Sequence, residues 1–263
     1  MKVGIIGCGT IGSEIAKAIL HIPNLELISL CDVDRNKAER LSLLLPEKPS
    51  IDSLSELISR VDLAIESASQ EVAKIALPLA IEKEKDIMIM SVGSLLGKEE
   101  LLARAEKKGI KVYLPSGAIA GIDGLKAASC ADVERVTLVT RKPPLALKGA
   151  PYLKDIDLSE IKEEKVVFSG TAEEAIKGFP ANINVAATLS LAGIGIKRTE
   201  VRIVADPKID RNIHEIEIIG GSGRILIRCE NLPSPTNPKT SYLASLSAIA
   251  LLKQIASSVK IGT

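Results

Sequence analysis

Aromatic side chains are scarce in this sequence. Tryptophan is absent from the 263 residues, and aromatic residues make up only 2% of them. Because hydrophobic residues still account for 46%, the core has to be built from isoleucine, leucine, valine and alanine. Doubly wound α/β folds, whose buried strands are rich in these residues, have such a core. A chain of this length holds one large domain or two smaller ones.

An excess of charge of one sign is also missing, and so are long hydrophobic runs. Lysine and arginine number 34 against 33 aspartates and glutamates, without the clustered cationic stripe that nucleic-acid binding needs. No apolar run reaches membrane-spanning length, and the N-terminus has the pattern of a strand rather than of a signal peptide. We therefore expect a cytoplasmic protein without a nucleic-acid or membrane partner.

Paired cysteines are missing too. The four cysteines form no C-x-x-C pair and no zinc-like spacing, so we expect no metal site and reduced, buried thiols. Cys8 has a second interpretation, because a helix N-terminus could lower the pKa of its thiol and support a redox role. The simpler alternative is a small residue that fills a tight loop. The four are Cys8, Cys31, Cys130 and Cys229.

What the sequence does contain is a dinucleotide-binding fingerprint. The apolar segment Lys2–Ile6 leads into three glycines with G-x-G-x-x-G spacing, and the amphipathic stretch Ser13–Leu20 follows. The first glycine permits a tight turn, the second lets the backbone approach a pyrophosphate, and the third lets helix and strand pack closely. The pyrophosphate would bind the free N–H groups at the helix start. The predicted contacts are Gly7, Gly9, Thr10, Ile11 and Gly12.

An acidic residue completes this fingerprint and bears on the choice of cofactor. Asp32 ends the second apolar segment, 20 positions after Gly12. A carboxylate there accepts hydrogen bonds from the adenosine ribose hydroxyls and repels a 2′-phosphate, so Asp32 favours NAD. Arg35 could instead pair with a 2′-phosphate, which keeps NADP open as an accepted cofactor. The alternative for Asp34 and Arg35 is a solvated helix start.

Through residue 116, apolar strand patterns alternate with helix patterns. This alternation predicts a parallel sheet with right-handed crossovers and helices on both faces. Residues 1–116 are therefore predicted to form a doubly wound Rossmann domain. The predicted strands are 2–6, 25–31, 61–65, 86–90 and 110–113, and the predicted helices end at 20 or cover 35–44, 54–59, 70–81 and 98–108.

Beyond residue 116 the pattern changes to strands that alternate in period two. We predict a second α+β domain with a mostly antiparallel sheet over 117–238, for substrate binding and dimerisation. Residues 239–263 would form a C-terminal helix that returns to the first domain. Another helix would begin after Pro180 and end at Gly193. The predicted strands are 133–139, 164–168, 199–205, 213–219 and 224–229.

Small residues follow two strands of the first domain. Ligands of doubly wound sheets bind outside the carboxyl ends of the strands, where small side chains would let a flat cofactor lie along the rim. We expect the ribose and nicotinamide to pass residues at these ends, although ordinary turn chemistry explains the same residue types. The residues are Ala68, Ser69, Val92 and Gly93.

The sequence contains two histidines. His21 would end the first helix, where the helix dipole explains a cation. His214 alternates onto the face of Ile216 and Ile218, so its ring faces the interior or a cleft. A satisfied core histidine is the commoner fate of such a residue. A dehydrogenase fold needs an acid/base, however, and no other histidine can supply it, so we predict that role for His214.

The segment Asn237–Tyr242 is predicted to open the last helix. Thr240 or Ser241 would cap that helix, and Lys239 would add a positive charge beside its free N–H groups. This arrangement suits a substrate carboxylate. An ordinary helix cap with a solvated lysine is the alternative.

With these motifs the chain resembles the L-aspartate dehydrogenase family over its whole length. The specific parts are Pro115–Gly121, Phe179–Ala186, the strand of His214 and Asn237–Ser241. The resemblance implies that Ala118 and Asn184 contact the cofactor and that His214 is the acid/base. It also implies oxidation of L-aspartate to iminoaspartate with NAD or NADP in a homodimer. The imine would hydrolyse to oxaloacetate and ammonia or feed NAD biosynthesis through quinolinate.

Two other functions compete with this interpretation. A related reductase, of the dihydrodipicolinate reductase or homoserine dehydrogenase type, would share the cofactor domain, but its substrate-domain motifs are not found here. A non-catalytic, NADH-sensing regulator would usually carry a basic DNA-reading helix, which this sequence lacks. L-aspartate dehydrogenase therefore stays the first hypothesis.

One predicted strand also bears on assembly. Val201, Ile203 and Ala205 alternate with charged residues, so one side of this strand must be buried. The antiparallel region offers no obvious helix of its own to cover that side. We therefore predict a homodimer through this sheet or its edges.

Overall fold

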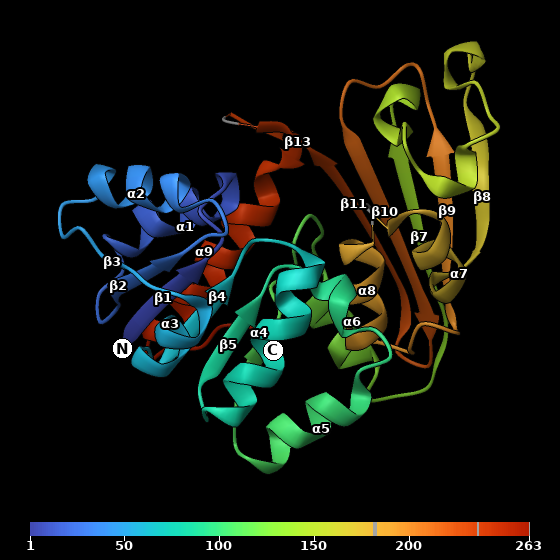
Figure 1. The fold of residues 1–263 in the computed structure, drawn as a ribbon. Helices are drawn as coiled ribbons and strands as arrows, with labels where there is room; N and C mark the ends of the chain where they lie inside the picture. The colour runs from blue at the N-terminus through green and yellow to red at the C-terminus, as the bar shows by residue number, and fades with distance from the viewer. Residues whose placement is uncertain (181–182, 236, 263) are drawn as a thin grey trace. The chain divides into compact units, whose positions relative to one another are not determined.

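The chain folds into two compact units (Figure 1). Unit 1 comprises Met1–Pro115 and Ser245–Ile261, and unit 2 comprises Ser116–Ala244 with the C-terminal residues. The chain therefore leaves unit 1 once and returns to it within its last helix. The computed structural model describes residues 1–180, 183–235 and 237–262, without the side chains of residues 238 and 239.

Unit 1 contains a six-stranded sheet in the order β3-β2-β1-β4-β5-β6, and neighbouring strands are parallel. The order reverses between β1 and β4, as it does in doubly wound dinucleotide-binding folds. The strands are β1 (Lys2–Ile6), β2 (Glu26–Cys31), β3 (Ser50–Ile51), β4 (Leu63–Glu66), β5 (Asp86–Ile89) and β6 (Val112–Tyr113).

Alternate residues of the strands point to opposite sides of this sheet, and helices cover both of its faces. Val3 and Ile5 of β1 pack in one apolar cluster with α1, α2 and α9. Gly4 faces α3 on the other side, where a Cβ atom would lie 2.7 Å from Leu57. The predicted α/β fold is confirmed. The helices are α1 (Thr10–Ile19), α2 (Arg35–Leu44), α3 (Leu54–Arg60), α4 (Gln70–Glu82), α5 (Glu99–Lys107) and α9 (Tyr242–Ala256).

Unit 2 contains a five-stranded sheet in the order β11-β10-β7-β9-β8. The β7–β9 pair is parallel and the other pairs are antiparallel, so the predicted mostly antiparallel sheet is confirmed with one parallel pair. The strands are β7 (Val133–Lys142), β8 (Lys165–Thr171), β9 (Thr199–Ala205), β10 (Asn212–Gly220) and β11 (Gly223–Asn231), and a separate pair comprises β12 (Pro233–Ser234) and β13 (Asn237–Ser241).

One face of the unit 2 sheet, called the inner face here, is buried under helices of the same unit. Val201, Ile203 and Ala205 lie on that face, in one cluster with residues of all three helices. The argument that this side needs a partner chain was therefore wrong, because α7, which the sequence analysis did not predict, and its neighbours cover it. The helices are α6 (Ile122–Ala128), α7 (Ala172–Gly178) and α8 (Asn184–Ala192).

The segment that leads into the last helix also differs from the prediction. Residues Asn237–Ser241 form strand β13, which pairs with β12, and α9 begins only at Tyr242. The serine and threonine that suggested a helix cap are therefore part of a short hairpin. No helix in the described part of the chain is long and apolar enough to span a membrane.

Candidate functional site

The predicted pyrophosphate loop has the backbone geometry that its glycines suggest. Gly7 adopts φ +96°, and a Cβ atom there would lie 2.7 Å from the backbone of Ala68. At Gly12 a Cβ atom would lie 1.9 Å from the carbonyl oxygen of Gly7. At Gly9, in contrast, no heavy atom lies within 4 Å of the Cβ position. The open side at Gly9 fits the close approach of a phosphate to the backbone.

The N-terminus of α1 continues this loop. Gly9 is its N-cap residue, and no side chain caps the first turn. Thr10 and Ile11 are half-buried, and Gly12 is buried. The first N–H groups of a helix lack intrahelical partners, and the helix dipole favours an anion beside them. The first turn of α1 therefore fits a pyrophosphate group.

Asp32 follows β2 and is held by the backbone. Its Oδ2 accepts the N–H of Cys8 at 2.7 Å, and its Oδ1 accepts the N–H of Asp34 at 2.9 Å. Each carboxylate oxygen has two acceptor positions, so both can still accept a ribose hydroxyl. Asp34 caps α2, and Arg35 pairs with Glu39 at 3.0 Å on an exposed surface. These two contacts agree with a solvated helix start.

Cys8 is not activated by the helix start. Its side chain is buried, and burial together with the charge of Asp32 raises the pKa of the thiol to about 12. The suggestion that this pKa is lowered was wrong, because burial and the neighbouring carboxylate act in the opposite direction. The four cysteines carry free thiols, but only Cys8 is buried, as a small, packed residue. Cys31 and Cys229 are half-buried and Cys130 is exposed, so the expectation of buried thiols was wrong for these three.

Glu66, at the end of β4, is a buried residue beside the candidate site that the sequence analysis did not single out. Its side chain is fully buried. Its Oε1 accepts the N–H of Ala68 at 2.8 Å and the hydroxyl of Ser91 at 2.9 Å, and its Oε2 accepts the N–H of Ser91 at 3.0 Å. This carboxylate thereby ties the loop after β4 to the loop after β5. The signal was an acidic residue at the end of an otherwise apolar strand.

These two loops hold the residues predicted to line the cofactor path. Ala68 is exposed, and Ser69 caps α4 by accepting the N–H of Val72 at 3.3 Å. Val92 is 2% exposed and begins a short 3₁₀ helix, so its side chain packs inside the unit. Gly93 is half-buried. Only Ala68, Ser69 and Gly93 therefore offer an accessible surface to a ligand.

His214 lies on β10, on the inner face of the unit 2 sheet. As predicted, Ile216 and Ile218 share that face, and all three side chains are buried. The ring Nδ1 lies 3.1 Å from Oγ1 of Thr140 on the neighbouring strand, which fixes the orientation of the ring. Burial and the positive charge of Lys142 lower the pKa of His214 to about 3. The imidazole is therefore neutral at physiological pH.

Lys142 is a candidate site residue that lies beyond the strand predicted over 133–139. The strand instead runs through Lys142, two residues beyond Thr140 and thus on the same face. Burial lowers the pKa of Lys142 to about 8. A histidine, a threonine and a lysine therefore meet on the inner face.

The loop of Ala118 reaches the same end of the sheet. Asn231, the last residue of β11, is buried, and its Nδ2 donates to the carbonyl oxygen of Ala118 at 2.8 Å. In the strand register Asn231 is opposite Asn212, and His214 is opposite Cys229. The loop carrying Ala118 is thus fixed to the strand next to His214.

Asn184 is the first residue of α8, which packs against the inner face. Ile183 and Ala186, on either side of it, line a small cavity together with Thr140 and Lys142. The N-terminus of α8 therefore lies close to the polar side chains of the sheet. Ala118, Asn184 and His214 all belong to unit 2.

The three predicted substrate-binding residues lie in β13. Thr240 is half-buried, and Oγ of Ser241 is buried with no hydrogen-bond partner among the described residues. The side chain of Lys239 lies outside the described residues. Ser241 ends this strand and directly precedes α9, so it lies at the predicted N-cap position, although its Oγ caps no N–H group among the described residues.

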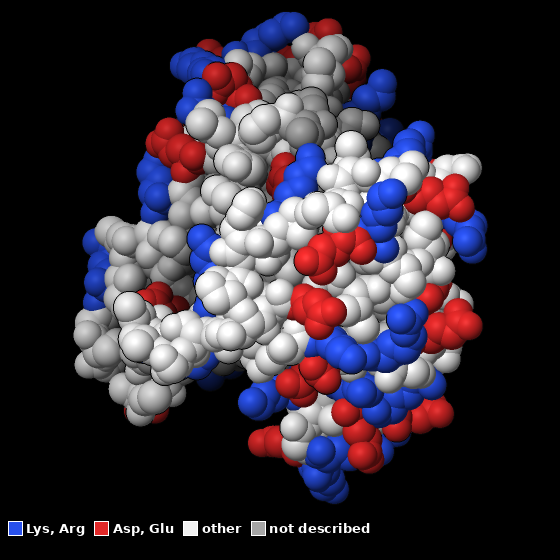
Figure 2. Space-filling model, turned by 90° about the vertical axis from the view of Figure 1, so that its left-hand side faces the viewer, with Lys and Arg blue, Asp and Glu red and all other residues white. Residues whose placement is uncertain are grey.

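The surface charge and the possible metal ligands of the described residues also bear on what the protein could bind. Figure 2 shows lysine and arginine interspersed with aspartate and glutamate over the face that it presents. Among the described residues, no group of His, Cys, Asp or Glu is arranged to hold a metal ion. Polar groups gather at the glycine loop and the Glu66 loops of unit 1 and, separately, on the inner face at His214 in unit 2.

A doubly wound unit with this loop, joined to a second unit with a buried polar cluster, defines the class of dinucleotide-dependent dehydrogenases. Family profiles agree: one described as the NAD-binding domain of homoserine dehydrogenase matches residues 7–115, and one described as the C-terminal domain of aspartate dehydrogenase matches residues 123–255. The chain belongs to the L-aspartate dehydrogenase family.

Individual relatives support this membership over the full chain. L-aspartate dehydrogenase of Methanosarcina barkeri is 50% identical, with 100% of both chains covered. That of Nitrosopumilus maritimus is 44% identical, covering 100% of this chain and 99% of the relative. The crystal structure of aspartate dehydrogenase from Thermotoga maritima is similar with a TM-score of 0.77 and 31% identity, covering 100% of this chain and 99% of that one.

Proposed function

We propose that this protein is an L-aspartate dehydrogenase that oxidises L-aspartate to iminoaspartate. The observation that carries the proposal is the buried, neutral His214 held by Thr140 and flanked by Lys142, in a chain of this family. NAD would accept the hydride in this reaction. The glycine loop and Asp32 supply the contacts that fit NAD, and NADP stays an alternative acceptor because Arg35 lies nearby in the sequence.

The reaction requires removal of a proton from nitrogen and of a hydride from Cα. The substrate ammonium group loses one proton, and the hydrogen on Cα then leaves with the electron pair of its bond, which gives the iminium form of the product. His214 is the group proposed to accept the proton, because its ring is neutral and Thr140 leaves Nε2 for this exchange. Ala118 and Asn184 would orient the nicotinamide end of the cofactor.

A pKa of about 3 would make His214 a weak base on its own. Substrate carboxylates beside the ring add negative charge, which stabilises the imidazolium and raises its pKa. General bases work best when their pKa lies near the working pH. The two carboxylates of the bound substrate would therefore raise the pKa of His214 and make it a stronger base for the proton of the same substrate.

The experiment that tests the activity is a substrate screen. Purified protein is mixed with each amino acid and with NAD or NADP, and formation of the reduced cofactor is followed by absorbance. We expect turnover with L-aspartate above that with any other amino acid. No turnover with L-aspartate, or faster turnover of another substrate, would contradict the proposal.

The setting of the reaction is part of the proposal. The free thiols fit the reducing cytoplasm. Iminoaspartate would hydrolyse to oxaloacetate and ammonia or pass into NAD biosynthesis through quinolinate. Trapping of labelled product from L-aspartate, with and without an enzyme that consumes the imine, would separate the two fates.

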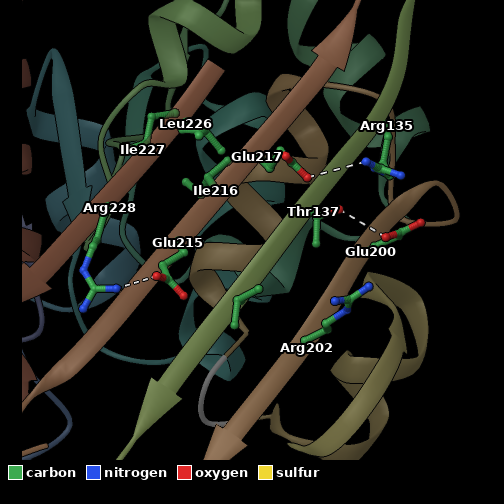
Figure 3. Close-up of a pocket in the computed structure, with 11 residues that line it drawn as sticks. Arg135, Thr137, Glu200, Arg202, Glu215, Ile216, Glu217, Leu226, Ile227 and Arg228 are labelled. Atoms are coloured by element: carbon green, nitrogen blue, oxygen red, sulfur yellow. Dashed lines mark hydrogen bonds and ion pairs between the residues drawn. The ribbon is translucent and has the colours of Figure 1, made fainter. Parts of the chain in front are cut away.

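We further propose a homodimer, now through the outer face of the unit 2 sheet, opposite α6–α8. Figure 3 shows this face, where ion pairs join Arg135 to Glu217 and Arg228 to Glu215. A groove of about 570 Å³ lies between these side chains. Because both signs of charge occur on one face, a second copy related by a two-fold axis can meet it with complementary charge.

Sedimentation analysis of the wild type and of Arg202→Glu tests this assembly. Arg202 is exposed on β9 and lies on the outer face (Figure 3), so reversing its charge should convert a dimer to monomers. Lys154→Glu is the control, because Lys154 is exposed in a segment that packs on α7 instead. A monomeric wild type at micromolar concentration would refute the dimer.

A further inference from the structure

Three polar side chains interrupt the apolar inner face of the unit 2 sheet at one end. Lys142 and Thr140 lie two residues apart on β7, and Thr140 is the register partner of His214 on β10. Leu138, the next inner-face residue, is 1% exposed in the core. Lys142 is therefore the last inner-face residue of its strand and a diagonal neighbour of His214.

Lys142 and Thr140 also share a small cavity. The cavity is otherwise lined by apolar residues, among them Phe179 and Ile183, and it has a volume of about 10 Å³. That volume holds about one water molecule. Lys142 is half-buried, and apart from Lys142 and Thr140 the side chains that line this cavity are apolar. Burial lowers the pKa of Lys142 to about 8, so its ammonium form still prevails at neutral pH.

We propose that Lys142 binds one of the two carboxylates of the amino-acid substrate, next to His214. The proposal rests on the proposed function. The amino group of the substrate has to reach His214, and both carboxylates of aspartate lie within a few bonds of that nitrogen. An ammonium group on the neighbouring strand is the complementary charge, and charge-assisted hydrogen bonds of this kind are the strong ones.

A carboxylate bound to Lys142 would also change the pKa of His214, the proposed base. The charge of Lys142 is one of the two causes that lower the pKa of His214. A carboxylate bound to Lys142 offsets that charge, so the pKa of the ring rises only when a substrate with a carboxylate is in place. Lys142 would thus link recognition of a dicarboxylic amino acid to proton removal from it.

The variant Lys142→Met tests this assignment. We expect the KM for L-aspartate and the inhibition constant of succinate, a dicarboxylate without an amino group, to rise about 10- to 100-fold, as for a lost hydrogen bond between charged groups. The Kd for NADH should stay unchanged, and Lys142→Arg should recover part of the loss. Lys148→Met is the matched control, because Lys148 is an exposed lysine of the same unit.

The outcomes separate this inference from the proposed function. A wild type without activity on L-aspartate contradicts the function itself. An active wild type whose Lys142→Met variant keeps its KM and its succinate constant overturns the role of Lys142 alone. A fall in kcat at unchanged KM overturns it as well, because Lys142 would then act in proton transfer rather than in carboxylate binding.

A measurement on the wild-type protein does not depend on how the variant folds. Acetylation by an N-hydroxysuccinimide ester, followed by peptide mass spectrometry, reports the accessibility of individual lysine amines. Succinate together with NADH should slow acetylation of Lys142 severalfold and leave Lys148 unchanged. Equal rates at Lys142 with and without succinate would overturn the proposal.

Discussion

The two units build their sites in different ways. In unit 1 the proposed cofactor contacts come mostly from one contiguous segment, Gly7–Gly12, whose conformation is set by its own glycines. In unit 2 the proposed site is assembled from β7, β10, β11 and the N-terminus of α8, which are far apart in the sequence. A local motif can specify the first kind of site, whereas strand register has to specify the second.

Each unit also contains a buried side chain that fixes a loop. Glu66 joins two loops of unit 1 through three hydrogen bonds, and Asn231 holds the loop of Ala118 in unit 2 through one. Both anchors are buried residues at the end of a strand. Supports of this kind hold functional loops in a productive geometry.

The largest expected effect separates chemistry from cofactor binding. His214→Ala removes the proposed base from unit 2, so kcat with L-aspartate should fall by about 100- to 10,000-fold. NADH is proposed to bind unit 1, so the Kd of His214→Ala for NADH should stay within about twofold of the wild-type value. Steady-state kinetics and NADH fluorescence check both values. Near wild-type turnover would show that His214 is only a core residue.

The next prediction addresses the choice of cofactor in unit 1. Asp32→Ala removes the acceptor for the ribose hydroxyls, so the KM for NAD should rise about 10-fold or more. The KM for NADP should stay equal or fall, because the repulsion of the 2′-phosphate is lost. Kinetics with both cofactors measure the ratio. An unchanged preference would remove Asp32 from the site and direct attention to Asp34.

A third prediction concerns pH. The pKa of His214 is lowered from 6.5 to about 3 in the folded protein, so below about pH 6.5 the unfolded chain binds a proton that the folded chain does not. This group therefore contributes stability that is present above pH 6.5 and is lost as the pH falls towards 3.

Urea unfolding between about pH 7 and about pH 5 measures this loss. The free energy of unfolding of the wild type should fall more steeply than that of His214→Gln, by up to about 1.4 kcal/mol per pH unit. Parallel curves for the two proteins would contradict the burial of a neutral ring.

The smallest expected effect concerns the loop anchor of unit 2. Asn231→Ala removes the hydrogen bond to the carbonyl oxygen of Ala118, so the KM for NAD should rise about 2- to 10-fold, as for one neutral hydrogen bond. Asn231→Asp keeps the shape but not the donor and should behave alike. Unchanged kinetics in both variants would show that this loop needs no anchor.

The sequence predicted most of unit 1 because its signals are local. Continuous apolar strands, three glycines and an acid at fixed spacing need no knowledge of distant partners. The burial of His214 was also predictable, since alternation along one strand decides which way a side chain points. The capping-box pair Thr171 and Glu174 is a comparable local signal for α7.

The features that the sequence did not predict depend on which strands and helices lie side by side in the fold. Lys142 becomes a site residue only because β7 continues through it and lies beside β10. The Thr240–Ser241 signal placed the start of α9 correctly, since the helix begins directly after Ser241, but it did not reveal that this segment also pairs with β12. Likewise, Val201 and Ile203 could be predicted to be buried, but the helices that bury them could not.

The most direct test of the account uses L-aspartate with deuterium on Cα and the wild-type protein with NAD. The reduced cofactor is isolated and analysed by mass spectrometry. We expect the deuterium to be transferred to the cofactor and turnover to be slower than with unlabelled substrate. Unlabelled reduced cofactor, or none at all, would contradict the claim that this protein removes a hydride from Cα of L-aspartate.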